Sequence, residues 1–420
     1  MAKVNFTPTT CSVADEAVER AAREGYGRLL AYLAARTHDL AGAQDALADA
    51  FAAALTQWRV EGVPDNPAGW LFTIARRRQV DAGRRRATMQ AFARETAPIE
   101  AEAIFAEIEG LDQIPDRRLA LLFACAHPAL DAAIRAPLML QAVLGFDAAA
   151  VGSAFLVAPA TMAQRLTRAK QKIRAAGIPF SLPDLNDMPA RLDAVLEGIY
   201  AAFTRGWEGA FSHDPRQRNL AEEAIWLGRL VAQLVPNEAE ALGLLALMTL
   251  SNARKAARRD AKGRYVPLDQ QDTNLWDHAA IGDASAVLGA ARALGRPGRF
   301  QIEAAIQAEH VDRAQTGRTD WAVVAALYAK LADYAATPVV EVNRAVALAN
   351  AGNARVGLAI LQRAGADGFL DDYQSYWAAL AELSTRCGLD EAATHAYGRA
   401  IGLETDPATR AFLMDRRAAL

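Results

Sequence analysis

Residues 145–174 read GFDAAAVGSAFLVAPATMAQRLTRAKQKIR and decide the fold of the first half of the chain. The pattern predicts a helix, a tight turn and a second helix that begins at Pro159, where a missing N–H costs little. Apolar residues recur at helical spacing along this second helix, at Met162, Leu166, Ala169 and Ile173. Between Pro159 and Arg174 there is no acid and there are five cations, namely Arg165, Arg168, Lys170, Lys172 and Arg174. Such a helix fits the major groove of DNA, although a solvated basic face on an ordinary helix has the same pattern.

The predicted recognition side chains lie along the outer face of this second helix. We expect Ala163, Gln164, Arg165 and Arg168 to face the groove, with Lys172 on the same side. Glutamine and arginine can form bidentate hydrogen bonds with adenine and guanine respectively. Thr161 either contacts a phosphate or caps the start of the helix.

Composition favours an all-α protein with several domains. The chain has 420 residues, many of them alanine, and 52% of them are hydrophobic, which suits closely packed helices. The net charge is only −3, so any affinity for DNA must come from local clusters of cations. The three cysteines are far apart, and we expect no metal and no cofactor. We also expect a cytoplasmic protein without a membrane segment, since no signal peptide or long apolar run is found.

A second amphipathic helix is predicted over residues 41–58. Its apolar stripe runs from Ala43 to Trp58, and its other face carries Gln44, Asp45 and Asp49. The two aspartates lie one turn apart without a cation between them, which is slightly unfavourable in an isolated helix. They therefore suggest an external basic partner.

A third helix is predicted over residues 68–86, after a loop with two prolines. It combines Trp70 with six cations, namely Arg76, Arg77, Arg78, Arg84, Arg85 and Arg86. Tryptophan can stack on an unpaired base while arginines hold the backbone, although Trp70 could equally anchor the core. Arg76, Arg77 and Arg78 span most of a turn, so at least one of them faces another side. The triplet Arg84–Arg86 suits phosphate contacts or, alternatively, a solvated helix end.

The predicted domains are residues 15–86, 114–177 and 190–420, with an acidic linker at 87–113 and prolines at 178–183. The last domain contains helical segments of similar length. The turn at Gly352 aligns with the turn at Gly388, 36 residues later, which is close to the roughly 34-residue period of helix-pair repeats. Residues 260–300 break this pattern and read as an insertion.

The order of these motifs resembles the extracytoplasmic-function subfamily of bacterial sigma factors. AGAQDALADAFAAALTQW (41–58) is similar to region 2.2, NPAGWLFTIARRRQVDAGRRR (66–86) to regions 2.3–2.4, and LVAPATMAQRLTRAKQKI (156–173) to region 4.2. FACAHPAL (123–130), LDQQDTNLWD (268–277), TDWAVVAALY (319–328) and PVVEVNRAVALA (338–349) resemble a subgroup with a tetratricopeptide-like C-terminal extension.

The resemblance implies a protein that directs core RNA polymerase to promoter DNA. Gln44, Asp45 and Asp49 would bind the clamp helices of the beta-prime subunit, although the family usually has an acid where Gln44 stands. The arginine-rich third helix would read the minus-ten element, and the recognition helix the minus-thirty-five element. The acidic linker would follow the RNA-exit path, unless it is only a solvated connection. The family's Asn-Glu-Gly is replaced by Thr204-Arg205-Gly206.

The extension is typical of a module that binds protein or peptide, and it would either inhibit or complete the sigma module. Three other classes of protein are alternatives. The histidines are isolated and no catalytic motif is present, which argues against an enzyme. A pure repeat scaffold would leave the arginines incidental. A helix-turn-helix regulator with a ligand- or protein-sensing repeat domain would bind duplex DNA without polymerase.

Overall fold

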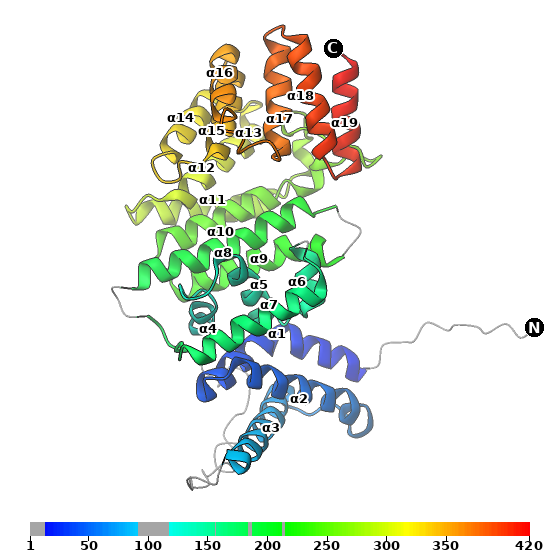
Figure 1. Ribbon diagram of the computed structural model, residues 1–420, viewed down its shortest axis with the longest axis vertical. Helices are drawn as coiled ribbons and strands as arrows, with labels where there is room; N and C mark the ends of the chain where they lie inside the picture. Colours follow the sequence, from blue (N-terminus) through cyan, green and yellow to red (C-terminus); the bar gives the residue numbers. More distant parts are fainter. Residues whose placement is uncertain (1–12, 91–116, 156, 184–186, 212–214) are drawn as a thin grey trace, which may run out of the picture. The chain divides into compact units, whose positions relative to one another are not determined.

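The computed structural model describes residues 13–90, 117–155, 157–183, 187–211 and 215–420 (Figure 1). In this part of the chain every regular element is a helix, and the only extended pairing is a bridge between Arg259 and Tyr265. The all-α prediction is therefore confirmed. The chain divides into two compact units, Met1–Ala224 (the first unit) and Ile225–Leu420 (the second unit).

The first unit is built from helices. In chain order they are α1 (Val13–Thr37), α2 (Leu40–Glu61), α3 (Pro67–Gln90), α4 (Arg118–Cys125), α5 (Ala132–Leu144), α6 (Ala148–Ala154), α7 (Pro159–Ala175), α8 (Met188–Glu208) and the first half of α9 (Pro215–Leu234). Residues 87–90, predicted as the start of the linker, continue α3. The rest of the predicted linker, residues 91–113, lies outside the described residues.

Short polar side chains begin several of these helices. Asp39 caps α2 by accepting a hydrogen bond from the backbone N–H of Gly42, and Asn66 does the same for Gly69 at the start of α3. Asp131 caps α5, which ends at Gly145 with a φ of 74°. This left-handed conformation suits glycine and turns the chain sharply into α6.

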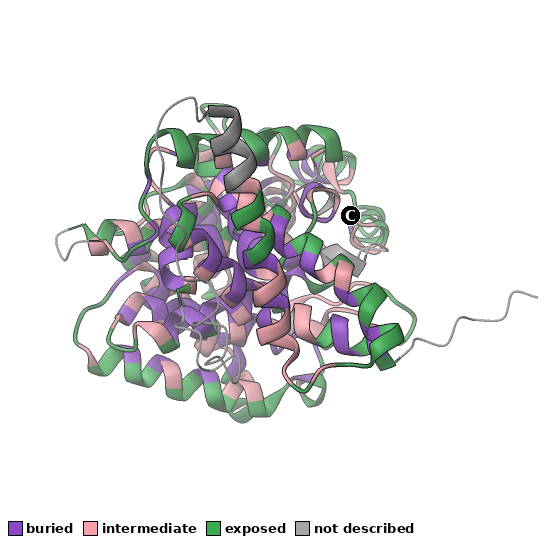
Figure 2. Ribbon diagram, turned by 90° about the horizontal axis from the view of Figure 1, so that it is seen from below, coloured by how far each residue is buried: buried purple, intermediate pink, exposed green. Residues whose placement is uncertain are grey.

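The core of the first unit gathers around α1. This helix packs against α2, α3, α4 and α5. Leu29, Leu33, Leu47, Phe72 and Phe123 are all completely buried between these helices. In Figure 2 the buried residues lie on the inner sides of the helices and the exposed ones on the outer sides. Burial of each such side chain contributes about 1.5–3 kcal/mol.

Helix α8 packs within the first unit, although the sequence groups residues 190–208 with the extension. Its apolar stripe, which includes Leu192, Val195 and Ile199, is buried, and the helix contacts α4 and α5. The guanidinium of Arg191 donates a hydrogen bond of 2.8 Å to the backbone carbonyl of Phe123. The prolines at 178–183 therefore do not separate two compact units.

The second unit continues with helices that follow one another in pairs. They are α10 (Ala239–Asn252), α11 (His278–Ala293), α12 (Arg299–Val311), α13 (Arg313–Thr316), α14 (Trp321–Leu331), α15 (Pro338–Asn350), α16 (Ala354–Ala364), α17 (Gln374–Arg386), α18 (Asp390–Leu403) and α19 (Pro407–Ala418). Gly352 lies between α15 and α16 with a φ of 95°, and Gly388 lies between α17 and α18 with a φ of 73°. The two aligned glycines thus occupy equivalent left-handed turns.

The predicted insertion at 260–300 is shorter in the structure. Three 3-10 turns, Lys255–Arg258 (η2), Leu268–Gln270 (η3) and Thr273–Leu275 (η4), cover the irregular part, and α11 begins at His278. Asp277 caps α11 through the backbone N–H of Ala280. Buried Ala284 and Leu288 then supply the helix's inner stripe. Because charged residues fill the turns before Asp277, the short apolar pattern of α11 could not be recognised in the sequence.

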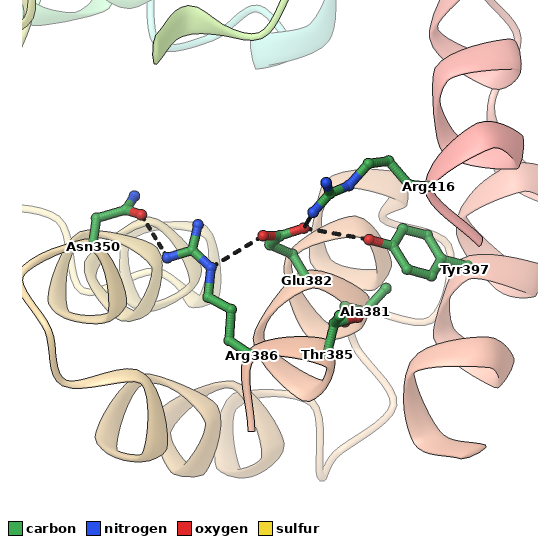
Figure 3. A network of polar contacts seen from close by, with 7 residues as sticks. All are labelled: Asn350, Ala381, Glu382, Thr385, Arg386, Tyr397 and Arg416. Atoms are coloured by element: carbon green, nitrogen blue, oxygen red, sulfur yellow. Dashed lines mark hydrogen bonds and ion pairs between the residues drawn. The ribbon is translucent and has the colours of Figure 1, made fainter. Parts of the chain in front are cut away.

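A network of polar side chains joins the last helices of the second unit, and we call it the Glu382 network (Figure 3). Glu382 on α17 accepts hydrogen bonds from Arg386 at 3.0 Å, from Arg416 on α19 at 2.5 Å and from Tyr397 on α18 at 3.3 Å. Arg386 also donates to the Asn350 side chain on α15 at 2.8 Å. One carboxylate therefore links α17, α18 and α19, and Arg386 extends the link to α15.

Candidate nucleic-acid interface

Helices α6 and α7 pack closely across a short turn. A Cβ atom on Gly152 of α6 would lie 2.7 Å from the backbone oxygen of Val157, so only glycine fits this approach. Pro159 is the first residue of α7, as predicted. The predicted apolar stripe is also confirmed, because Met162, Leu166, Ala169 and Ile173 are buried. This packing fixes which side of α7 remains open to solvent.

The open side of α7 carries Arg165, Arg168 and Lys172, which we call the α7 basic face. All three are exposed, and they line a groove together with residues at and just before the start of α5, namely Leu130, Asp131, Ala133 and Ile134. Gln164 and Thr161 are exposed as well, and Ala163 is half-buried. Ala158 is the residue that precedes α7, so Thr161 lies inside the first turn rather than at the cap.

Helix α3 distributes its first cluster of cations around its surface. Arg76 is buried at 6% exposure, whereas Arg77 and Arg78 are exposed. Burial and the nearby Arg36 lower the pKa of Arg76. The expectation that these three residues do not share one side is therefore confirmed, and Arg77 and Arg78 are the pair that solvent reaches.

Trp70 lies in the first turn of α3 and is half-buried. Its ring packs edge-to-face against the buried Trp58 of α2, with 5.5 Å between centroids. Such a pair contributes about 0.5–1.5 kcal/mol beyond simple burial, so Trp70 helps anchor α3 on α2. The side chains of Arg84, Arg85 and Arg86 lie outside the described residues, and their predicted phosphate contacts stay predictions.

The outer face of α2 does not present its three predicted contact residues equally. Asp49 is exposed, but Gln44 is half-buried and accepts a hydrogen bond of 2.8 Å from the Nζ atom of Lys170 on α7. Asp45 is exposed and its charge acts on Lys170, raising a lysine pKa that burial lowers. Asp45 thus has a cation nearby within the chain, which the sequence did not indicate.

Lys170 counts among the cations of residues 159–174, but the sequence did not predict its contact with Gln44. It belongs to the cations of α7 but lies beside the buried stripe, four residues after Leu166. Arg174 points the same way, with 3.7 Å between its Nη1 atom and Asp39 at the start of α2. The cations of α7 therefore separate into two groups, and only the α7 basic face is turned away from α2.

Other kinds of site find little support in the described ranges. No group of three or more metal-binding side chains is found among the described residues. Within the same residues no helix is long and apolar enough to cross a membrane. Cys125 is completely buried in the first unit, and burial raises the pKa of its thiol well above the usual range. A protonated, buried thiol is a poor nucleophile.

Comparison with known proteins identifies two parts of the chain. Residues 22–88, which include most of α1 and nearly all of α3, match Sigma-70 region 2. Residues 191–292 match a family of unknown function, DUF6596, and this match runs across the boundary between the two units. The region 2 match supports a sigma-factor-like role in transcription initiation.

A curated protein matches almost the whole chain. An uncharacterized protein of Rhizobium meliloti (strain 1021) is 36% identical over 409 residues, which cover 95% of this chain and 94% of the relative. No solved structure matches. The chain belongs to the same family as this Rhizobium protein and carries a sigma-70 region 2 near its N-terminus.

Proposed function

We propose that this protein is a sigma factor of the extracytoplasmic-function type, which brings core RNA polymerase to a set of promoters. The observation that carries the proposal is the region 2 match over α1–α3, since this region serves both core polymerase and the minus-ten element in the resembled family. Arg77 and Arg78 of α3 are exposed and available to melted DNA. Region 4 is then assigned to the helix-turn-helix of α6 and α7.

The α7 basic face suits the minus-thirty-five element. Arginine and lysine at this face supply phosphate contacts, which are insensitive to sequence and sensitive to salt. Gln164 and Arg165 lie toward the start of the helix, the part of a recognition helix that reads base edges. Each bidentate base contact is worth about 1–3 kcal/mol of discrimination.

Helix α2 is proposed to bind the beta-prime clamp helices through Gln44, Asp45 and Asp49. Lys170 donates a hydrogen bond to the side chain of Gln44 and lies near Asp45. Clamp binding through Gln44 and Asp45 would therefore compete with the packing of α7 on α2. Asp49 is exposed, and of these three residues it is the one most accessible to the clamp helices.

The second unit is proposed to be a tetratricopeptide-like module that binds a protein or peptide and regulates the sigma module. Its helix pairs and the equivalent turns at Gly352 and Gly388 support this assignment. Stacked helix pairs provide an extended surface for such a ligand. The acidic linker is proposed to follow the RNA-exit path of the polymerase.

Binding of the purified full chain to sigma-free bacterial core polymerase tests the clamp assignment. We expect Asp49→Lys to weaken binding and Asp45→Lys with Asp49→Lys to weaken it further, because both reverse charges that would meet a basic partner. The matched control is Asp283→Lys with Asp333→Lys, two exposed residues of the second unit. Equal affinity of the wild type and the Asp45/Asp49 variant would overturn the assignment.

Run-off transcription separates a sigma factor from a helix-turn-helix regulator. With core polymerase and a promoter located by mapping transcription starts after overexpression, a sigma factor supports initiation that core alone does not. A regulator would instead bind the duplex by itself and leave core polymerase inactive. That second result would contradict the proposed function.

A further inference from the structure

A buried arginine in the second unit lacks the acidic partner that such a residue normally has. Arg254 follows α10 and is only 6% exposed. A buried charge is expensive unless it is paired and its hydrogen bonds are satisfied. The surroundings of Arg254 therefore indicate whether the second unit itself supplies the negative charge and the hydrogen-bond acceptors that this side chain needs.

The hydrogen bonds of Arg254 are incomplete. Its Nη2 atom donates to the side-chain oxygen of Gln307 on α12. Its Nε atom is buried and has no hydrogen-bond partner in the described part of the chain. His310 lies one turn after Gln307, is 7% exposed, and its Nδ1 atom likewise has no partner among the described residues. Residues three apart share a helix face, and the charge of Arg254 acts on His310, so Gln307 and His310 lie on the side of α12 near Arg254.

The charges near Arg254 add to the imbalance. Burial and the cations Arg258 and Arg313 lower its pKa to about 10, against a smaller opposite effect of Tyr328. No carboxylate of the described chain is among the groups that shift it. At pH 7 Arg254 remains a cation, since that value is still well above 7. Burial, Arg254 and Arg313 lower the pKa of His310 to about 3, so its ring is neutral.

Arg313 does not share this deficit, because backbone carbonyls accept hydrogen bonds from both of its Nη atoms. Its guanidinium donates to the backbone carbonyls of Leu268 at 2.9 Å, Asp269 at 2.7 Å and Gln271 at 2.9 Å. It also lies 5.1 Å from the ring centroid of Trp276. These bonds hold the irregular segment after η2 in place. Of these two arginines, Arg254 is therefore the one with a buried nitrogen that has no hydrogen-bond acceptor among the described residues.

We propose that Arg254 and His310 form a buried site for a small oxyanion of the carboxylate or phosphate class. One oxyanion oxygen would accept a hydrogen bond from Nε of Arg254, and a neutral imidazole can present Nδ1–H to the same group. The anion would also supply the negative charge that the site lacks. A buried water could satisfy the hydrogen bonds but not the charge. The inference does not depend on a role in transcription.

Thermal unfolding of the full chain in different anions tests the site. Inorganic phosphate and acetate are titrated separately, with sodium chloride holding the ionic strength constant. We expect a saturable rise in Tm with one of them, roughly 5–10 °C at a hundredfold excess over its Kd. If the rise in Tm saturates at a lower concentration of phosphate than of acetate, the site prefers phosphate; the opposite order indicates a carboxylate.

Two variants decide whether Arg254 is responsible. Arg254→Met should fold, because it removes a buried charge that has no acidic partner and keeps an apolar side chain of similar length. Without the anion its Tm should equal or exceed that of the wild type, and the order should reverse when the anion is added. The control Arg296→Gln removes an exposed arginine of the same unit and should respond to the anion like the wild type.

Equilibrium dialysis of labelled phosphate or acetate against the wild-type chain gives a readout that needs no variant. Saturable binding of about one anion per chain supports the site. Absence of binding by both anions at millimolar concentration, or an identical anion response in Arg254→Met, would overturn the proposal and leave a buried water as the partner of Nε.

Discussion

The cations of the α7 basic face and those of the Glu382 network have opposite surroundings. Arg165, Arg168 and Lys172 are exposed, and no ion pair joins them to an acid within the described residues. Arg386 and Arg416 instead converge on one carboxylate in the Glu382 network (Figure 3). Both groups lie on helix surfaces of a chain whose net charge is nearly zero. Charge content alone would not tell them apart.

The two surroundings give the two groups of cations different roles. A paired cation donates its hydrogen bonds to other residues of the fold, and it thereby holds one helix against another. An exposed cation without an acid keeps its charge available to a polyanion, and it contributes little to stability. The α7 basic face should therefore matter for DNA and not for folding, and the Glu382 network should matter for folding and not for DNA.

The largest expected effect comes from the α7 basic face. Replacing Arg165, Arg168 and Lys172 together by alanine should reduce promoter-dependent run-off transcription by at least about 100-fold, because base and phosphate contacts are lost together. The stability of the chain should stay within about 0.5 kcal/mol, since all three side chains are exposed. Binding of the polymerase complex to promoter DNA should also depend less steeply on salt, with the slope reduced by up to about 2.7.

A matched triple variant sharpens this comparison. Arg355, Arg363 and Lys330 are two arginines and a lysine that are exposed in the second unit. Their replacement by alanine changes the net charge equally and should leave transcription and its salt dependence unchanged. If both triple variants lose transcription to the same extent, then overall charge and not the α7 basic face governs DNA binding.

Several features of the first unit could be predicted from sequence because they are local. The stripe of α7 follows from spacing, and its start follows from the fixed φ of Pro159. The same reasoning found α2 and α3, but Leu55 and Val80, which fall at apolar positions of their helical patterns, are exposed, at 40% and 38%. Periodicity predicts which residues share a face, but not how wide a stripe the neighbouring helix covers.

Features that depend on tertiary contacts could not be predicted in the same way. The contact of Lys170 with Gln44 joins residues 126 positions apart, and nothing in either helix indicates it. The missing hydrogen-bond acceptor and acid at Arg254 depend on Gln307 and His310 of α12 and on Arg313 of α13. These three residues lie more than 50 positions later in the chain. Cations are easy to count in a sequence. Whether each of them meets an acid depends on packing.

An intermediate effect is expected at the Glu382 network. Replacing Glu382 by alanine leaves Arg386 and Arg416 without their shared acceptor and should destabilise the second unit by about 1–2 kcal/mol. Hydrogen exchange should show the loss mainly in α17 and α19, and run-off transcription at permissive temperature should not change. Glu391→Ala, at an exposed glutamate of α18, is the control and should cost less than about 0.5 kcal/mol.

The same network predicts a dependence on pH. Burial alone would raise the pKa of Glu382, but hydrogen bonds from Arg416 and Arg386 outweigh burial and lower it. A carboxylate with a lowered pKa in the folded state stabilises the fold at pH values above its usual pKa of about 4.3. That contribution is lost as the pH falls through the lowered value. Acid unfolding of α19, followed by hydrogen exchange, should therefore lose this pH dependence in Glu382→Gln.

The smallest effect concerns the contact between α2 and α7. Lys170→Met removes the hydrogen bond to Gln44 but keeps the aliphatic stem, so the first unit should lose only about 0.5–1.5 kcal/mol. Arg174→Ala should cost less, because Arg174 is 61% exposed and lies 3.7 Å from Asp39. A double-mutant cycle between Gln44→Ala and Lys170→Met, measured by urea unfolding, isolates the pair. A coupling energy near zero would mean that Lys170 does not stabilise the fold through Gln44 and is available to bind DNA, like the α7 basic face. A clear coupling energy would mean that one side of α7 stabilises the fold and the other side binds the partner.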